Sequence, residues 1–176
     1  MEQAKIDLLV IEMQQGSEAA FKEIFDYFQP SLVRFSYKVC CNEQMAKDAV
    51  QNSWLKVTKS IGKLKDPRAF KSWLYQMVRW QSIDLVKKAA NDPLEFTEQD
   101  ASSVSQHTGV EEMQSSLLAL INLLPEIDRQ AIYLFYLEEM KIKEIATILS
   151  TPEGTIKSRL NRARNMLKVK IEQLGE

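Results

Sequence analysis

The chain has few of the side chains on which catalysis or metal binding usually depends. Its only cysteines, Cys40 and Cys41, are adjacent, and its only histidine, His107, lies in a polar stretch far from them. These residues cannot supply a metal site of three or four Cys and His ligands, a disulfide framework, or a Ser or Cys nucleophile with a well-placed histidine base. The glycines are too far apart to share a phosphate-binding loop. We therefore expect no catalytic activity, no cofactor and no metal.

The two cysteines fall within an apolar helical pattern. Free cysteine is among the most buried residue types, so we interpret both as buried, reduced thiols. A redox role for the pair is the alternative, and the sequence leaves it open.

Basic residues are concentrated in two regions that the nearly neutral total conceals. The chain has 23 Lys and Arg against 24 Asp and Glu, yet residues 54–88 hold nine Lys and Arg against two Asp, and residues 154–170 hold six against none. Either region alone is compatible with a solvated helix face. Because phosphate backbones attract such surfaces, we favour two nucleic-acid-binding regions.

Aromatic residues are interleaved with the first basic region. Single-stranded nucleic acid is bound by basic grooves that also offer aromatic side chains for base stacking. Phe70, Trp73 and Met77 share one helical stripe and are expected in the core. Tyr75 and Trp80 fit that stripe less well, and the pattern leaves open whether they pack in the core or face the nucleic acid.

The second basic region lies on the later of two helices joined by a tight turn. Periodicity predicts a short helix at 142–149, and Thr151-Pro152-Glu153 combines a capping hydroxyl, a proline at the first helical position and a carboxylate at the positive end of the helix dipole. This is helix-turn-helix spacing, in which the second helix enters a major groove.

The elements that position these regions are also helices. Gly and Pro together number 10 in 176 residues, about half their usual usage. Hydrophobic periodicity and capping signals predict helices at 6–13, 17–28, 30–41, 42–61, 66–90, 113–124 and 127–138.

Between these helices, residues 91–110 carry four acidic and no basic residues before Gly109, with Pro93 and many Ser and Thr. We interpret this segment as an acidic, flexible linker. The sequence thus predicts an all-α chain of two small helical domains, residues 1–90 and 111–176, the second a helix-turn-helix. Without a long apolar run or a signal-peptide pattern, we expect a cytoplasmic protein with no direct membrane insertion.

Two long segments resemble a known family. Residues 48–88, DAVQNSWLKVTKSIGKLKDPRAFKSWLYQMVRWQSIDLVKK, resemble the second conserved region of bacterial RNA polymerase sigma factors of the extracytoplasmic-function (ECF) group. Residues 124–168 resemble their fourth region and contain the run PEGTIKSRLNRAR, which is distinctive even among helix-turn-helix proteins. The resemblance covers almost the whole chain in the same order.

The resemblance implies an alternative sigma factor, a non-enzymatic subunit that binds core RNA polymerase, recognises the minus-35 and minus-10 promoter elements and initiates transcription. The first domain would dock on the clamp helices of the β′ subunit and hold the unpaired non-template strand of the minus-10 element. The second would sit on the β flap and read duplex minus-35 DNA, with the linker running through the active-site and RNA-exit region. An anti-sigma factor is implied as a further partner.

The resemblance also assigns residues. Contacts with core polymerase would lie on one helix, opposite its buried stripe, at Lys47, Asp48, Gln51, Asn52 and Leu55. Minus-10 contacts would come from Lys63, Lys65, Arg68, Lys71, Tyr75, Gln76, Arg79 and Trp80. Minus-35 contacts would come from Lys157, Ser158, Asn161 and Arg162, with Arg159 and Arg164 on backbone phosphates.

Some positions depart from the family pattern. Asn52 stands where Glu is usual, which we expect to weaken or re-specify the contact with the clamp helices. Gln76 stands where Arg is common and Trp80 where Asn is common, so the minus-10 preference cannot be carried over. Glu139, Lys141 and Ser150 stand where the family usually has Gly, Ser and Gly. We expect these three changes to alter caps and turns and to leave the fold intact.

Two other classes of protein fit the same residues. One is an autonomous helix-turn-helix repressor or activator, which would bind duplex promoter DNA without polymerase. The other is a helical interaction module that does not bind DNA. The autonomous regulator would bind duplex promoter DNA alone, whereas a sigma factor would bind it only with core polymerase. DNA binding with and without polymerase therefore distinguishes these two classes.

Overall fold

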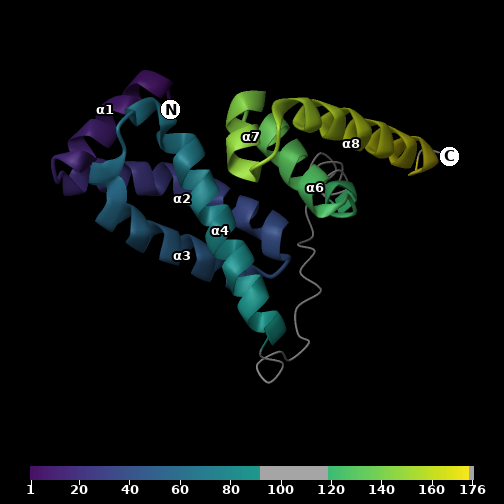
Figure 1. Ribbon diagram of the computed structural model, residues 1–176, viewed down its shortest axis with the longest axis horizontal. Coiled ribbons are helices and arrows are strands. Elements are labelled where there is room, and N and C mark those ends of the chain that lie inside the picture. The colour runs from purple at the N-terminus through teal and green to yellow at the C-terminus, as the bar shows by residue number, and fades with distance from the viewer. Residues whose placement is uncertain (92–118, 175–176) are drawn as a thin grey trace. The chain divides into compact units, whose positions relative to one another are not determined.

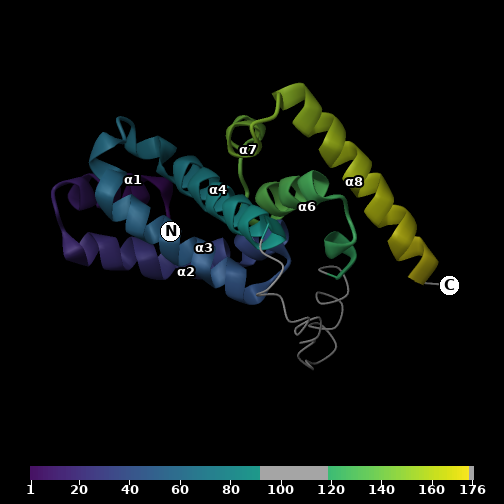
Figure 2. The ribbon, with the colours of Figure 1, turned by 60° about the horizontal axis from the view of Figure 1, so that its bottom comes forward.

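The computed structural model describes residues 1–91 and 119–174, with side chains to 172, and its regular elements in these ranges are helices (Figures 1 and 2). The chain divides into two compact units, Met1–Asp92 and Pro93–Glu176. The prediction of an all-α chain with two helical domains is confirmed. The expected linker from 92 onward, His107 and the predicted helix at 113–118 lie outside the described residues.

Unit 1 is built from four helices and two short 3-10 turns in residues 1–91. They are α1 (Gln3–Gln14), α2 (Glu18–Cys40), α3 (Glu43–Ser60), η1 (Ile61–Lys63), η2 (Pro67–Ala69) and α4 (Phe70–Asn91). Helix α2 packs against α1, α3 and α4, and α3 also packs along α4. The fully buried aromatic rings of Phe28, Phe35 and Phe70 lie at the centre of this core.

Capping residues begin the helices of unit 1 where the sequence predicts. The Ser17 hydroxyl accepts a hydrogen bond from the Ala20 N–H at 3.2 Å, and the Asn42 carboxamide accepts from the Met45 N–H at 2.8 Å. Gly16, at the end of α1, has a φ of 91°, a conformation that favours glycine. These local signals are sufficient to set the ends of α1, α2 and α3.

Pro30 does not begin a new helix, contrary to the prediction of separate helices at 17–28 and 30–41. It lies inside the continuous helix α2. Proline removes one backbone donor from a helix, a substantial cost in its interior. Phe28 and Leu32, on either side of it, are both buried in the same core, and this packing favours one continuous helix over two.

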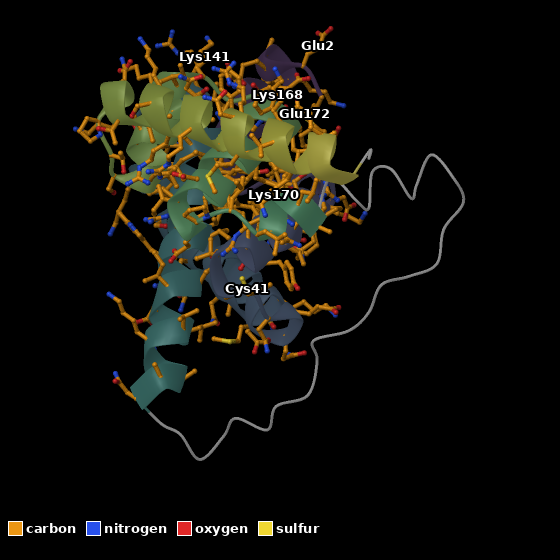
Figure 3. All side chains as sticks on the ribbon, turned by 90° about the vertical axis from the view of Figure 1, so that its right-hand side faces the viewer. Glu2, Cys41, Lys141, Lys168, Lys170 and Glu172 are labelled. Carbon is orange, nitrogen blue, oxygen red and sulfur yellow. The ribbon has the colours of Figure 1, made fainter. Side chains whose placement is uncertain are left out.

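Cys41 is not buried, so the prediction of two buried thiols is wrong for this residue. It is the C-cap of α2, with a left-handed φ of 53°, and its side chain is exposed (Figure 3). Cys40 is partly buried, and its thiol donates to the Ser36 carbonyl at 3.2 Å. Burial raises the pKa of the Cys40 thiol.

Unit 2 begins, in its described part, with a helical turn at 119–122. It continues with α6 (Glu126–Ile132), the π-helical turn η4 (Tyr133–Leu137), α7 (Ile142–Leu149) and α8 (Glu153–Leu174). Glu139 and Ser150 adopt left-handed φ angles of 51°. Both turns thus place non-glycine residues in a conformation that is less favourable for them than for glycine.

Candidate nucleic-acid interface

Helices α7 and α8 form the helix-turn-helix that the sequence predicts. Ser150 ends α7 in the left-handed conformation, the Thr151 hydroxyl donates to the Leu149 carbonyl at 3.0 Å, and the Ile156 N–H donates to the Pro152 carbonyl at 3.0 Å in the first turn of α8. The turn between the helices is therefore held by its own hydrogen bonds, and it fixes where α8 begins.

The inner face of α8 anchors it to the rest of unit 2. Ile156, Leu160, Ala163 and Leu167 are buried, and α8 packs against both α6 and α7. Ile145, Ile148 and Leu149 of α7 are also buried, as the sequence predicts. Because this face is fixed inward, the opposite face of α8 must point outward.

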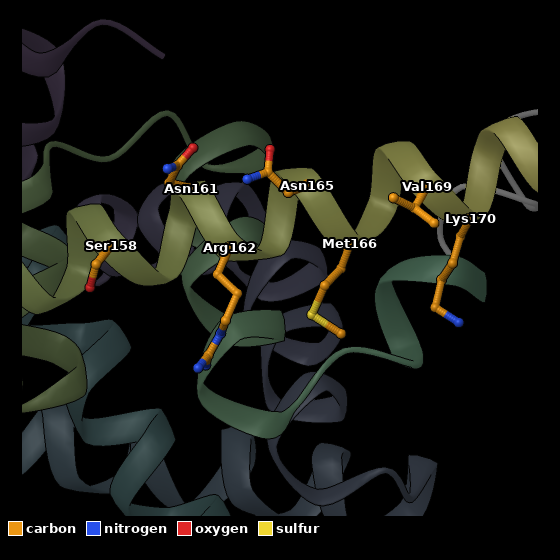
Figure 4. Close-up of a pocket in the computed structure, with 7 residues that line it drawn as sticks. All are labelled: Ser158, Asn161, Arg162, Asn165, Met166, Val169 and Lys170. Atoms are coloured by element: carbon orange, nitrogen blue, oxygen red, sulfur yellow. The ribbon is translucent and has the colours of Figure 1, made fainter.

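The outer face of α8, which we define as Lys157, Ser158, Asn161 and Arg162, is exposed. Figure 4 shows Ser158 and Arg162 directed to one side of the helix and Asn161 to the other. A shallow groove of about 650 Å³ continues along the helix past Met166 and Lys170. Arg164 and Lys168 are also exposed, and Nζ of Lys168 lies 3.8 Å from Oε1 of Glu172 (Figure 3).

A buried carboxylate organises two of the basic residues of α8. Asp128 of α6 is 0 % exposed and accepts hydrogen bonds from Arg159 Nη1 at 2.9 Å and from Arg162 Nε and Nη2 at 2.9 and 2.5 Å. The side chain of Arg162 is nevertheless 55 % exposed and that of Arg159 31 %. Asp128 is not among the residues predicted from the sequence, because it lies in the polar stretch Glu126-Ile127-Asp128-Arg129-Gln130, where no local pattern marks it as buried.

The predicted minus-10 residues divide into exposed, half-buried and buried sets, and Lys71 and Gln76 of α4 are the half-buried ones. Lys63, Lys65 and Arg68 are exposed in the loop between α3 and α4, and Trp80 is 54 % exposed on α4. A groove of about 370 Å³ brings Lys63, Gln76 and Trp80 together with Lys56, Lys59, Ser60, Trp73, Met77 and Gln81. This groove of unit 1 has the basic and aromatic lining expected of a single-strand surface.

Two of the predicted minus-10 residues do not lie at the surface. Tyr75 is fully buried, with its ring 5.3 Å from that of Phe35, and Arg79 is buried as well. The prediction that they contact DNA directly is therefore wrong. Because α4 packs against both α2 and α3, its buried arc is wider than one stripe and includes both positions.

Side-chain hydrogen bonds hold the loop between α3 and α4. Gln14 of α1 donates through Nε2 to the carbonyls of Ile61 at 3.0 Å and Leu64 at 2.7 Å. Asp66 accepts from the Arg68 backbone at 3.0 Å and from its guanidinium at 3.0 and 3.1 Å. The hydrogen bonds from the Arg68 side chain hold the pKa of Asp66 below its ordinary value.

The outer face of α3, which we define as Lys47, Asp48, Gln51, Asn52 and Leu55, points away from the core of unit 1. Leu55 is the apolar member of this face, and it is exposed. Lys47 forms an ion pair with Glu43, and Asp48 accepts from Gln44 at 2.9 Å, both within one turn. The structure brings together the five residues predicted to contact core polymerase, and that role stays a prediction.

The described residues form neither a metal site nor a membrane-spanning helix. In residues 1–91 and 119–174, no group of three His, Cys, Asp or Glu side chains lies close enough together to hold a metal ion. Within the same ranges no helix is both long enough and apolar enough to span a bilayer.

Comparisons with known proteins agree with both units. Residues 24–91 match the family model described as Sigma-70 region 2, and residues 114–167 match Sigma-70, region 4. The ECF RNA polymerase sigma-E factor of Haemophilus influenzae is 32% identical over 98% of this chain and 98% of its own. The ECF RNA polymerase sigma factor SigW of Bacillus subtilis is 27% identical over 93% of this chain and 95% of its own.

Solved structures show the same fold. CnrH in complex with the cytosolic domain of CnrY matches with a TM-score of 0.71 at 18% identity, over 96% of this chain and 98% of that chain. The sigma factor RpoE in complex with the anti-sigma factor NepR from Bartonella quintana also matches with a TM-score of 0.71, at 24% identity over 86% and 96%. The two family-model matches and the 32% identity with the Haemophilus influenzae sigma-E factor over 98% of this chain show that the chain belongs to the ECF group of RNA polymerase sigma factors.

Proposed function

We propose that this sigma factor reads minus-35 DNA with the outer face of α8, holds unpaired minus-10 bases in the groove of unit 1 and docks on core polymerase through the outer face of α3. The observation that carries the proposal is the basic, exposed surface of α8, a helix whose other face is locked into unit 2. The chain would bind and position DNA, while core polymerase would supply the catalytic groups of RNA synthesis.

At the minus-35 element, α8 offers two kinds of contact. Arg162 and Asn161 carry donors and acceptors suited to guanine and adenine edges in the major groove. Arg164 and Lys168 lie further along or around the helix, where phosphates are the nearer partners. Phosphate contacts add affinity on every sequence, whereas base contacts discriminate between sequences.

At the minus-10 element, the groove of unit 1 combines lysines with exposed aromatic surface. The indole of Trp80 is available for stacking, and Lys63 and Lys59 line the same groove. Base stacking on an aromatic side chain tolerates any sequence because every base has a π-face. Such a surface stabilises strands that have separated and so favours promoter opening.

Protein partners fit the remaining exposed surfaces. The outer face of α3 is proposed to contact the β′ clamp helices, and unit 2 to contact the β flap. CnrH was solved in complex with the cytosolic domain of CnrY, and RpoE in complex with the anti-sigma factor NepR, and we propose an anti-sigma factor for this chain as well. This sigma factor would act where core polymerase acts, in the cytoplasm.

Two substitutions on α8 test the minus-35 part of the proposal. Holoenzyme carrying Arg162→Ala is expected to lose preference at one or two adjacent minus-35 positions in a promoter library. Holoenzyme carrying Lys168→Ala is expected to transcribe all library members less well, with a weaker dependence on salt. If Arg162→Ala lowered activity equally on every minus-35 sequence, the assignment of the outer face of α8 would be wrong.

A further inference from the structure

The buried carboxylate of Asp128, on α6, accepts hydrogen bonds from two arginines of α8, and one of them, Arg162, belongs to the outer face of that helix. Its contacts with Arg159 and Arg162 span 31 and 34 residues of sequence, from α6 to α8. A fully buried carboxylate requires partners of this kind, because a buried charge is costly unless it is paired and hydrogen-bonded. The question is whether this cluster only joins two helices or also directs the arginine that faces DNA.

Asp128 binds one particular edge of the Arg162 guanidinium. A guanidinium has five N–H donors in a fixed planar fork. Nε and Nη2 form its side edge, and both of these atoms donate to the same oxygen, Oδ2 of Asp128. None of the hydrogen bonds described for Arg162 within residues 1–91 and 119–174 uses Nη1.

The end edge of the guanidinium, formed by Nη1 and the second N–H of Nη2, is therefore left for an outside partner. The exposure of Arg162, at 55 %, shows that solvent reaches the side chain although its inner edge is bound. Two parallel donors on one edge match the O6 and N7 acceptors of guanine. Arg159 occupies the other oxygen, Oδ1, so the carboxylate cannot easily rotate away from Arg162.

We propose that Asp128 is a positioning residue for minus-35 recognition, which holds the guanidinium of Arg162 with its end edge directed at a guanine. This inference rests on the proposed function of α8 and adds a residue that lies outside the DNA-facing surface. A flexible arginine must lose rotamer freedom when it binds, and a side chain already held in one orientation loses less. Asp128 thus increases discrimination between bases without touching DNA.

The test is a minus-35 promoter library transcribed by holoenzyme carrying Asp128→Asn. Asparagine keeps the shape and one acceptor oxygen but removes the charge that holds two arginines. A bidentate arginine–guanine pair discriminates by about 5- to 150-fold, and we expect Asp128→Asn to reduce that ratio by about 2- to 5-fold at the positions where Arg162→Ala acts. Glu126→Gln, which removes an exposed acidic charge from the same helix, is the matched control and should leave the ratio unchanged.

A double variant separates positioning from stability. In the Arg162→Ala background, Asp128→Asn should cause no further loss of base preference, because the side chain that it orients is absent. Thermal unfolding of each variant sets the assay temperature below every transition, so that all chains are folded when compared.

The outcomes distinguish this inference from the function on which it rests. If Asp128→Asn lowered transcription equally on all minus-35 sequences while Arg162→Ala changed base preference, Asp128 would be a structural residue only and the positioning role would be overturned. If Arg162→Ala itself left base preference unchanged, the proposed minus-35 role of Arg162 would fail and the positioning role with it.

Discussion

Replacing Gln14 with alanine should loosen the loop that carries Lys63 without disturbing the groove directly. Gln14 lies on α1, outside residues 24–91 that match the region 2 family model. Its single amide nitrogen donates to the carbonyls of Ile61 and Leu64, which bracket Lys63. The substitution removes both hydrogen bonds at once and leaves the basic side chains in place.

The magnitude follows from the two bonds. A neutral hydrogen bond contributes about 0.5–1.5 kcal/mol net, and the loss is largest where the orphaned carbonyl cannot reach water. Both carbonyls of this loop take part in partly buried bonds, so the lower part of the range applies. Gln14→Ala should therefore cost about 1–2 kcal/mol, which lowers the equilibrium constant for the attached loop about 5- to 30-fold.

Hydrogen exchange and promoter melting measure this effect together. The amides of residues 61–66 should exchange faster in the full chain carrying Gln14→Ala, and permanganate reactivity of minus-10 thymines should fall in holoenzyme made with it. Gln3→Ala is the matched control, because Gln3 lies on the same helix and, in the interactions described for it, donates only to Asp7 in a solvent-exposed hydrogen bond. Unchanged exchange at 61–66 relative to this control would refute the reasoning, as would normal melting with a loosened loop.

Three further predictions concern Trp80, the outer face of α3 and the two cysteines. Trp80→Ala should leave thermal stability nearly unchanged but weaken minus-10 opening by about 1–3 kcal/mol of lost stacking, measured by permanganate footprinting; normal opening would make Trp80 a packing residue only. Gln51→Ala with Asn52→Ala should weaken binding to core polymerase while circular dichroism stays native, and unchanged affinity would remove α3 from the interface. Cys41 should react with iodoacetamide faster than Cys40 near neutral pH, because burial raises the pKa of the Cys40 thiol and lowers its thiolate fraction; equal rates by mass spectrometry would contradict this.

The sequence was sufficient to predict features that depend on neighbouring residues. Caps at Ser17 and Asn42, and the start of α8 after Thr151-Pro152, involve residues within a few positions of one another. The buried stripe of α8 was also predictable, because helical periodicity alone specifies it. These features give the helix-turn-helix and therefore most of the candidate minus-35 surface.

Features that depend on distant residues were not predictable in the same way. Tyr75 lies beside the apolar stripe of α4 and not on it. Because α4 is covered by two helices, a position beside the stripe is buried too. Pro30 is a strong local signal for a helix start, and it was outweighed by the core on both sides of it. In each case packing against neighbouring helices outweighed the structure that the local sequence favours.

The two positioning contacts show the same limit. Gln14 lies 47 and 50 positions from its acceptors, and Asp128 lies 31 and 34 positions from its arginines. No periodicity or spacing rule links residues so far apart in one sequence. Both contacts nevertheless lie directly behind residues that the sequence assigned to DNA, and the structure therefore adds to the predicted site instead of replacing it.

The most direct test of the central claim is promoter opening by this chain with core polymerase. Duplex promoter fragments selected by the reconstituted holoenzyme would be treated with permanganate in the presence of the chain alone, core polymerase alone, or both. We predict reactive thymines in the minus-10 region only when both are present, and their loss when the minus-35 element is scrambled. Opening that persists without this chain, or specific duplex binding by the chain alone with no opening in the mixture, would contradict a sigma factor and favour an autonomous helix-turn-helix regulator.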